Sequence, residues 1–264
     1  MFDQTIIYTK ETLIDKLKEI RKRGWVEGTR TGNVGNVGNT LEDLLGIKEN
    51  NLPLPNAAEW ELKCQRLQTT SLVTLFHMEP SPTALKFVPA ILLPNYGWFH
   101  KEAGKKYPLD EMSFRQTIST QGRSDRGFQI VVDRTQQKVM VSFDYSAVSQ
   151  KHEAWLIGVE KKIGLGEINP QPYWGFEDLY HKAGTKLHNC FFIGVHHKNV
   201  NGIEYFQYSK ILMLKSFSKA RFISAIEKGE ILVDFDARTG HNHGTKFRFR
   251  NNKLHELYDE VTEL

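Results

Sequence analysis

The chain has 264 residues, of which 40% are hydrophobic and 11% aromatic, so it carries enough apolar surface to fold and is not expected to be disordered. Its 35 basic and 31 acidic residues leave a net charge of +4, which by itself does not indicate a nucleic-acid partner. No apolar run approaches the roughly 18 residues of a membrane span, and no secretory signal is expected at the start. Cys64 and Cys190 are isolated thiols, which excludes a disulfide framework and favours a reducing, cytoplasmic location.

The N-terminal part predicts two helices separated by a loop. Apolar residues recur at helical spacing over residues 12–23, and Gly24 is expected to end that helix. Residues 32–39 repeat glycine and asparagine, which predicts a loop that can approach another molecule closely; no Gly-Lys-Ser/Thr follows, so an NTPase is excluded. Thr40 is expected to cap a second helix, with Asp43 as its capping-box partner.

Residues 48–56 are polar and contain proline, which predicts an irregular connection. The remaining chain mixes strands and helices, and a polar turn near residues 135–137 predicts a hairpin. Strands are expected at 59–63, 72–77, 114–120, 128–132, 139–145, 190–197, 204–214 and 231–235, and helices at 176–187 and 218–228. Many antiparallel neighbours favour the α+β class with a mixed central β-sheet flanked by helices.

A possible catalytic pair lies in the first of these strands. Residues two apart in a strand share a face, so Glu61 and Lys63 should point the same way while Leu62 faces the core. A carboxylate beside a lysine can hold a hard divalent cation and position a water molecule. Taken alone, Glu-x-Lys is usually an exposed ion pair worth less than about 1 kcal/mol.

The longer string Gly38-Asn39-Thr40-Leu41-Glu42-Asp43-Leu44-Leu45-Gly46, followed by Pro55-Asn56 and Glu61-Leu62-Lys63, resembles the MvaI/BcnI family of type II restriction endonucleases, relatives of the mismatch-repair nicking enzyme MutH. The resemblance implies the PD-(D/E)xK nuclease fold, with two lobes around a DNA cleft. By position, Glu42 matches the family's helix glutamate, Glu61 its strand carboxylate and Lys63 its catalytic lysine. Glu42, Asn56 and Glu61 are then expected to hold Mg²⁺, and Lys63 to orient or activate the attacking water.

Asn56 departs from the family pattern, because the family has a metal-binding aspartate there. An asparagine carbonyl can still ligate a cation, but it lacks the charge, so Mg²⁺ should bind more weakly. Two explanations stay open: Asn56 is an engineered substitution that allows a DNA complex to be studied uncut, or it is native to this branch.

The C-terminal segment resembles the part of the family that reads DNA bases. Arginine donates two hydrogen bonds to guanine, histidine donates to the same edge, and aspartate accepts from cytosine. The expected DNA-binding residues are Asp236, Arg238, His241, His243, Lys246, Arg248 and Arg250. Alternation with Phe247 and Phe249 should place the charges on one strand face and the phenyl rings in the core. Two other interpretations are a solvated basic strand and a zinc pair at His241 and His243.

Together these features predict a Mg²⁺-dependent, sequence-specific endonuclease that cuts double-stranded DNA. The resemblance implies a short, C·G-rich, near-palindromic site of the CC-N-GG kind. The resemblance implies a bacterial or archaeal monomer, with a catalytic lobe over residues 1–165 and a DNA-recognition lobe over 166–264 that may share one sheet. It also implies a neighbouring gene for a cognate DNA methyltransferase. The alternatives are a DNA-binding protein that no longer cuts because of Asn56, a MutH-like nickase that needs a partner, and a soluble domain with a coincidental Glu-x-Lys.

Overall fold

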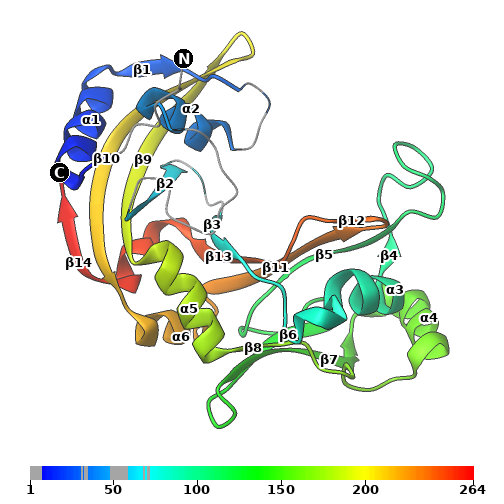
Figure 1. Cartoon of the computed structure of the whole chain (residues 1–264). Helices are drawn as coiled ribbons and strands as arrows, with labels where there is room; N and C mark the ends of the chain where they lie inside the picture. The colour runs from blue at the N-terminus through cyan, green and yellow to red at the C-terminus, as the bar shows by residue number, and fades with distance from the viewer. Residues whose placement is uncertain (1–7, 31, 33–34, 48–58, 68, 70–71) are drawn as a thin grey trace. The chain divides into compact units, whose positions relative to one another are not determined.

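The computed structural model describes residues 8–30, 32, 35–47, 59–67, 69 and 72–264 (Figure 1). The helices are α1 (Lys10–Lys22), α2 (Asn36–Leu45), α3 (Leu93–Tyr96), α4 (Glu153–Ile163), α5 (Phe176–Leu187) and α6 (Lys219–Glu227), with shorter helical segments η1 (Thr83–Leu85), η2 (Val88–Leu92), η3 (Gln150–His152) and η4 (Asn251–Leu257). None of the helices in this part of the chain is long and apolar enough to cross a membrane.

The strands are β1 (Trp25–Glu27), β2 (Trp60–Arg66), β3 (Leu72–His77), β4 (Trp98–Phe99), β5 (Met112–Ile118), β6 (Arg126–Asp133), β7 (Lys138–Val148), β8 (Tyr173–Gly175), β9 (Asn189–Val200), β10 (Ile203–Phe217), β11 (Ile231–Arg238), β12 (His241–Asn242), β13 (Lys246–Arg250) and β14 (Tyr258–Glu263). The chain forms two compact units. The first contains residues 1–73, 183–221 and 250–264, and the second contains 74–182 and 222–249.

The first unit is built on a mixed sheet of five strands. The strand order is β1-β10-β9-β2, and β14 also pairs with β10. β9 and β10 form a long antiparallel hairpin whose turn is at Asn201-Gly202, as the sequence predicts. β2 instead runs parallel to β9, with Trp60 opposite Asn189 and Glu61 opposite Cys190. The start of β2 therefore lies beside the start of β9.

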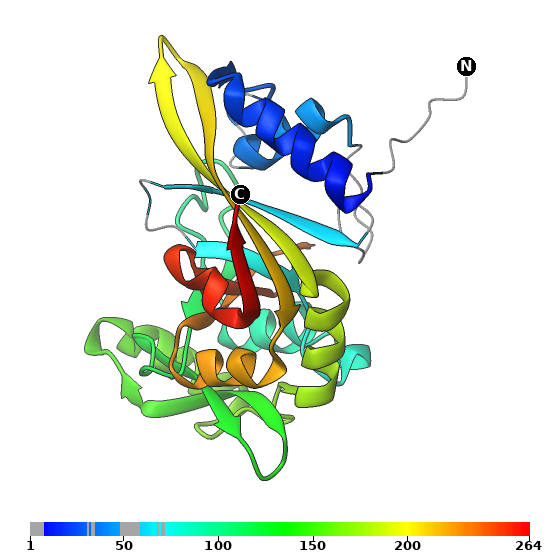
Figure 2. The same ribbon diagram turned by 90° about the vertical axis from the view of Figure 1, so that its left-hand side faces the viewer.

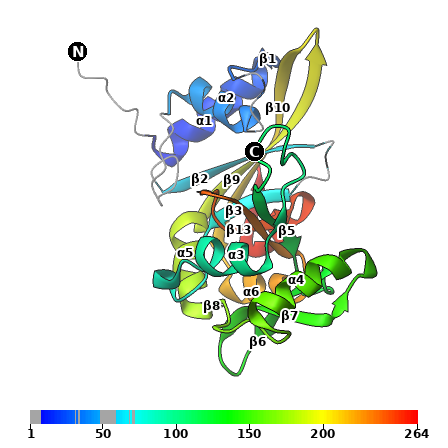
Figure 3. The ribbon, with the colours of Figure 1, turned by 90° about the vertical axis from the view of Figure 1, so that its right-hand side faces the viewer.

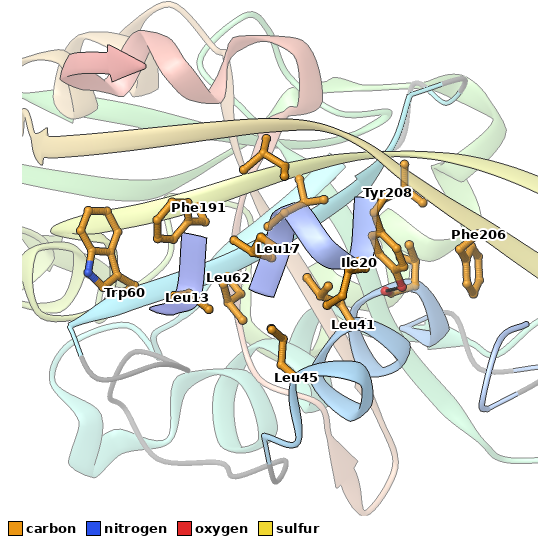
Figure 4. Close-up of a cluster of buried hydrophobic side chains, with 14 residues drawn as sticks. Leu13, Leu17, Ile20, Leu41, Leu45, Trp60, Leu62, Phe191, Phe206 and Tyr208 are labelled. Carbon is orange, nitrogen blue, oxygen red and sulfur yellow. Dashed lines mark hydrogen bonds between the residues drawn. The ribbon is translucent and has the colours of Figure 1, made fainter. Parts of the chain in front are cut away.

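Helices α1 and α2 lie next to the β9–β10 hairpin (Figure 2). Their apolar stripes pack with one face of the sheet in a core that is drawn in Figure 4. Leu13 and Leu17 come from α1, Leu41 from α2, and Trp60 and Leu62 from β2; all five side chains are buried. Burying an aliphatic side chain of this size contributes about 1.5–3 kcal/mol, so this core fixes α2 against β2.

The first helix agrees with its prediction, and the second begins earlier than predicted. α1 starts after a capping box made by Thr9 and Thr12, and Gly24 follows it at a φ of +73°. The prediction that Thr40 caps α2 with Asp43 is wrong, because α2 already begins at Asn36, within the segment expected to be a loop. Thr40 is fully buried inside the helix, where its hydroxyl lies 3.1 Å from Oδ1 of Asn36.

The second unit contains two sheets. One has the strand order β3-β13-β11-β5-β4, with β12 also paired to β11; the other has the order β6-β7-β8. β6 and β7 form the predicted hairpin, with Asp133 opposite Lys138. In Figure 3 the short α3 lies near α4 in this unit. Its core is strongly aromatic: Phe114 contacts Phe128 and Phe235, with ring centroids 5.4 and 5.5 Å apart.

The structure confirms the predicted α+β class with a mixed sheet flanked by helices. The predicted strands and helices after residue 59 are all present, with ends that shift by a few residues. The largest shifts are extensions of β2, β7, β9, β10 and β11 at their C-terminal ends. The irregular connection predicted over residues 48–56 lies outside the described residues.

Candidate functional site

Strand β2 presents two different faces. Trp60 and Leu62 point into the core of the first unit. Glu61 and Lys63 alternate with them, and Nζ of Lys63 lies 2.6 Å from Oε1 of Glu61. The predicted common face of Glu61 and Lys63, and the inward position of Leu62, are therefore confirmed.

This ion pair is not an ordinary surface pair. The side chain of Glu61 is 2% exposed and that of Lys63 is 15% exposed. A second ammonium group, Nζ of Lys186, lies 3.6 Å from Oε2 of Glu61 and is contributed by the last turn of α5. Removing a carboxylate from water costs several kcal/mol unless positive charge compensates it. The two lysines supply that charge at a carboxylate in a nearly dry position.

Lys186 is a site residue that the sequence does not indicate. It belongs to no motif with Glu61, and its helix enters the site only because β2 pairs in parallel with β9. α5 ends at Leu187 and β9 begins at Asn189, so the last turn of α5 lies at the end of the sheet where β2 starts. Lys186 could not be predicted because its position depends on the parallel pairing of β2 and β9, which are far apart in the sequence.

The residues behind Glu61 are neutral at ordinary pH. Burial raises the pKa of the Cys190 thiol to about 12; the charge of Lys63 opposes this rise and that of Glu61 adds to it. Burial, with contributions from Cys190 and Glu61, likewise keeps the pKa of Tyr258 well above its usual value. Cys190 is therefore a protonated core thiol and neither a nucleophile nor a soft metal ligand.

Glu42 lies on α2 and is half-buried. Burial raises the pKa of the Cys64 thiol, and the charge of Glu42 raises it further, which places this carboxylate in the neighbourhood of β2. Asn56, the third expected ligand, lies outside the described residues. The structure thus brings Glu61 and Lys63 together and adds Lys186, whereas the joint geometry of Glu42, Asn56 and Glu61 stays a prediction.

α2 is held in place by a partly buried polar network at its first turn. Asn36 donates a hydrogen bond of 2.7 Å to Glu204 of β10, and Arg66 of β2 and His197 of β9 lie 2.9 and 3.0 Å from the same carboxylate. Burial alone would raise the pKa of Glu204, but the Asn36 hydrogen bond and the charge of Arg66 hold it below its ordinary value. The network ties the helix that carries Glu42 to the strand that carries Glu61.

The donors at this site suit a hard cation. Oε2 of Glu61 is buried and has no hydrogen-bond partner in the part of the chain that the structure describes, so it is available as a ligand. Glu42 and Asn56 would add further oxygen donors, the kind that Mg²⁺ prefers. Among the described residues no three histidine, cysteine, aspartate or glutamate side chains gather closely enough to hold a metal ion by themselves.

The residues expected to read bases belong to the second unit, except Arg250 at the end of β13, which belongs to the first. Phe247 and Phe249 are fully buried, whereas Lys246 and Arg248 lie on the opposite face of β13, so the predicted alternation is confirmed. Lys246 forms an ion pair of 2.9 Å with Asp236, and Arg248 one of 3.3 Å with Asp234. The basic side chains on this face are therefore paired with carboxylates, and the face is not purely basic.

Asp236 forms more than one of these ion pairs. It also pairs with Arg115 of β5 at 2.8 Å, a residue that the sequence reading did not single out. Partial burial would raise the pKa of Asp236, but the Lys246 hydrogen bond and the charges of Lys246 and Arg115 keep it below its ordinary value. Asp236 therefore remains an ionised acceptor, the state needed to accept a hydrogen bond from a cytosine amino group.

Arg238, at the end of β11, is held by two groups from the segment before β5. Its Nη1 lies 3.0 Å from Oε1 of Glu111, whose side chain is 5% exposed, and its guanidinium carbon lies 4.7 Å from the ring centre of Tyr107. Clamping an arginine in this way reduces the conformational freedom that it loses on binding. Neither Glu111 nor Tyr107 was predicted, because both contacts join segments far apart in the chain.

The remaining expected DNA contacts are exposed. The rings of His241 and His243 lie 4.3 Å apart on and after the short strand β12, and Arg250 is the exposed last residue of β13. The zinc interpretation needs a third ligand, and within the described ranges no such cluster forms. The two histidines are accessible to an external partner.

Comparisons with known proteins show the family and the fold of the chain. The model of the MvaI/BcnI restriction endonuclease family matches residues 14–258. The structure of restriction endonuclease MvaI in complex with its cognate DNA substrate superposes with a TM-score of 0.77 at 24% identity, covering 97% of this chain and 99% of that one.

The structure of MvaI in the absence of DNA gives a TM-score of 0.53 at 24% identity, covering 98% and 99% of the two chains. No curated protein matches this sequence. The family match includes the Glu-x-Lys strand, α2 and the β11–β13 face, and it confirms the resemblance seen in the sequence. The chain belongs to the MvaI/BcnI restriction endonuclease family.

Proposed function

We propose that this protein is a Mg²⁺-dependent, sequence-specific endonuclease that cuts double-stranded DNA at a short, C·G-rich, near-palindromic site. The observation that carries the proposal is the buried Glu61 carboxylate with Nζ of Lys63 at 2.6 Å, within a chain of a restriction endonuclease family. The similar MvaI structure is a complex with DNA, which supports a duplex as the partner. The protein is proposed to act as a monomer.

Glu61, Glu42 and Asn56 would hold the ion, which when bound supplies Lewis-acid stabilisation of negative charge on the phosphodiester. Lys63, paired with Glu61, would orient the attacking water and stabilise charge that develops on the phosphate oxygens. Burial strengthens both effects, because charges interact more strongly where water is excluded. The ionised Asp236 and the clamped Arg238 would read cytosine and guanine edges.

The decisive experiment is cleavage of plasmid DNA in the presence of Mg²⁺. The protein and its Asn56→Asp variant should give discrete fragments, with Asn56→Asp faster or active at lower Mg²⁺ because an aspartate binds the ion more tightly. Lys63→Ala should lose at least about 100-fold in rate, since it removes a group that acts on the reacting atoms. EDTA should abolish cleavage. Absence of discrete fragments from Asn56→Asp would contradict the proposal.

Asn56 itself favours one second candidate, a DNA-binding protein of this fold that no longer cuts. That protein would bind a specific duplex with a strong salt dependence and would stay inactive after Asn56→Asp. A nickase that needs a partner would be inactive alone and would nick only when the partner is added. The plasmid assay separates these outcomes from the main proposal.

A further inference from the structure

Lys186 carries a second positive charge into the candidate active site. Its Nζ lies 3.6 Å from Oε2 of Glu61, on the carboxylate oxygen that Lys63 does not contact. The side chain is 22% exposed, so the ammonium group is partly shielded yet still reachable by a ligand at the surface. Leu187, the next residue, is fully buried and anchors this turn of α5. The position of Lys186 is thus set by the fold and is not that of a loose surface lysine.

The charges of this trio suit an anionic ligand. Glu61 carries one negative charge, and Lys63 and Lys186 carry one positive charge each. A phosphodiester also carries one negative charge, and a lysine ammonium is a compact donor that binds phosphate as a point charge. When a cation takes the Glu61 oxygens, the ammonium of Lys186 is left beside the place where the phosphate must lie.

We propose that Lys186 is a substrate-binding residue whose ammonium group contacts a phosphate oxygen of the DNA strand held at Glu61. The inference rests on the proposed function and adds a second lysine to the Glu-x-Lys motif. Lys63 then acts on the water and the reacting phosphate, while Lys186 holds the strand in register. It follows that neutralising Lys186 weakens DNA binding as well as cleavage.

The test measures binding of a fluorescent duplex that contains CC-N-GG over a series of salt concentrations, with Ca²⁺ in place of Mg²⁺ so that a cation is present at Glu61 while cleavage is suppressed. Each lysine–phosphate contact contributes about 0.9 to the slope of log K against log salt concentration. Lys186→Met should therefore lower the magnitude of this slope by about 0.9, and Lys186→Arg should keep it. Plasmid cleavage with Mg²⁺ should fall at least about tenfold in Lys186→Met and should largely recover in Lys186→Arg.

Lys215→Met is the matched control. Lys215 also pairs with one carboxylate, Glu260 at 3.5 Å, in the same unit, and its side chain is 34% exposed. This variant should leave the salt slope and the cleavage rate unchanged. Circular dichroism and thermal unfolding check that each variant is folded, and Lys186→Gln replaces Lys186→Met if the latter does not fold.

The proposal is overturned if the neutral variant keeps the slope of the unmodified protein, even when its cleavage is slower, because Lys186 would then act only through Glu61. It is also overturned if Lys215→Met changes the slope equally. If the unmodified protein binds the duplex but does not cut plasmid, the proposed function fails while the slope still tests Lys186. The two failures are therefore distinguishable.

Discussion

At the scale of single residues, the main determinant of the site is the burial of charge. Glu61 lies at 2% exposure with the ammonium groups of two lysines beside it. Glu204 remains ionised because Asn36, Arg66 and His197 surround it. A buried pair or network of this kind is costly to break, since removal of one member leaves the others unpaired away from water. The stability of the first unit thus depends on these two carboxylates.

Glu204 gives a pH dependence whose sign follows from its lowered pKa. A carboxyl whose pKa is lower in the folded than in the unfolded state stabilises the protein above the unfolded value of about 4.3, and this contribution is lost as the pH falls through the folded value. Glu204→Gln should therefore cost about 1–3 kcal/mol at pH 7 and much less near pH 3. Urea unfolding at both pH values measures this difference; an equal cost at the two values would contradict the assignment.

At the scale of elements, glycines at positive φ set where helices end and strands bend. Gly24 follows α1 at a φ of +73°, and a Cβ there would meet no heavy atom within 4 Å. Gly127 lies in the irregular part of the β6–β7 pairing at a φ of +77°, and a Cβ there would lie 2.3 Å from the backbone oxygen of Asp144. A side chain at either position would therefore strain the backbone, but only at Gly127 would it also lack space.

This difference predicts unequal effects of the same substitution. Gly24→Ala should cost about 1 kcal/mol, the backbone penalty alone. Gly127→Ala should cost about 2–4 kcal/mol, because the methyl group also collides with the main chain of the neighbouring strand. Thermal and urea unfolding of the two variants provide the measurement, with Gly24→Ala as the matched control. Similar losses of stability in both variants would contradict this prediction, because the β6–β7 pair would then accommodate the methyl group at no additional cost.

At the scale of the whole molecule, one chain supplies one Glu61–Lys63 pair. If the protein acts as a monomer, as proposed, it must cut the two strands of a near-palindromic site one after the other. The candidate base-reading residues of β11 and β13 belong mainly to the second unit and Glu61 to the first. Under the proposed function, specificity and cleavage would be carried by different parts of the chain.

Sequential cutting has a visible consequence. During digestion of supercoiled plasmid that carries one site, a nicked circular form should accumulate before the linear form appears. Analytical ultracentrifugation of the protein with a duplex oligonucleotide should show one chain per duplex. Direct conversion to linear DNA, with two chains bound per duplex, would be inconsistent with a single active site.

Much of the fold could be predicted because its signals are local. These local features include the apolar spacing of α1 and the glycine that ends it, the Asn201-Gly202 turn and the alternation of Lys246 to Arg250. The start of α2 could not be predicted from local signals. The Thr40 hydroxyl is hydrogen-bonded inside the core, and the first turn of the helix is held by Glu204, which is far away in the chain. A polar residue that is buried by tertiary contacts looks like a cap in the sequence.

The sequence by itself determined the family pattern, the α+β class and the shared face of Glu61 and Lys63, because a strand's period of two residues needs no tertiary information. Only the tertiary structure decided that Glu61 is buried, that Lys186 joins it, and that Glu111 and Arg115 hold the candidate base-reading side chains. Burial and long-range ion pairs depend on which strands become neighbours. That pairing is a property of the packed chain, and no local stretch of residues encodes it.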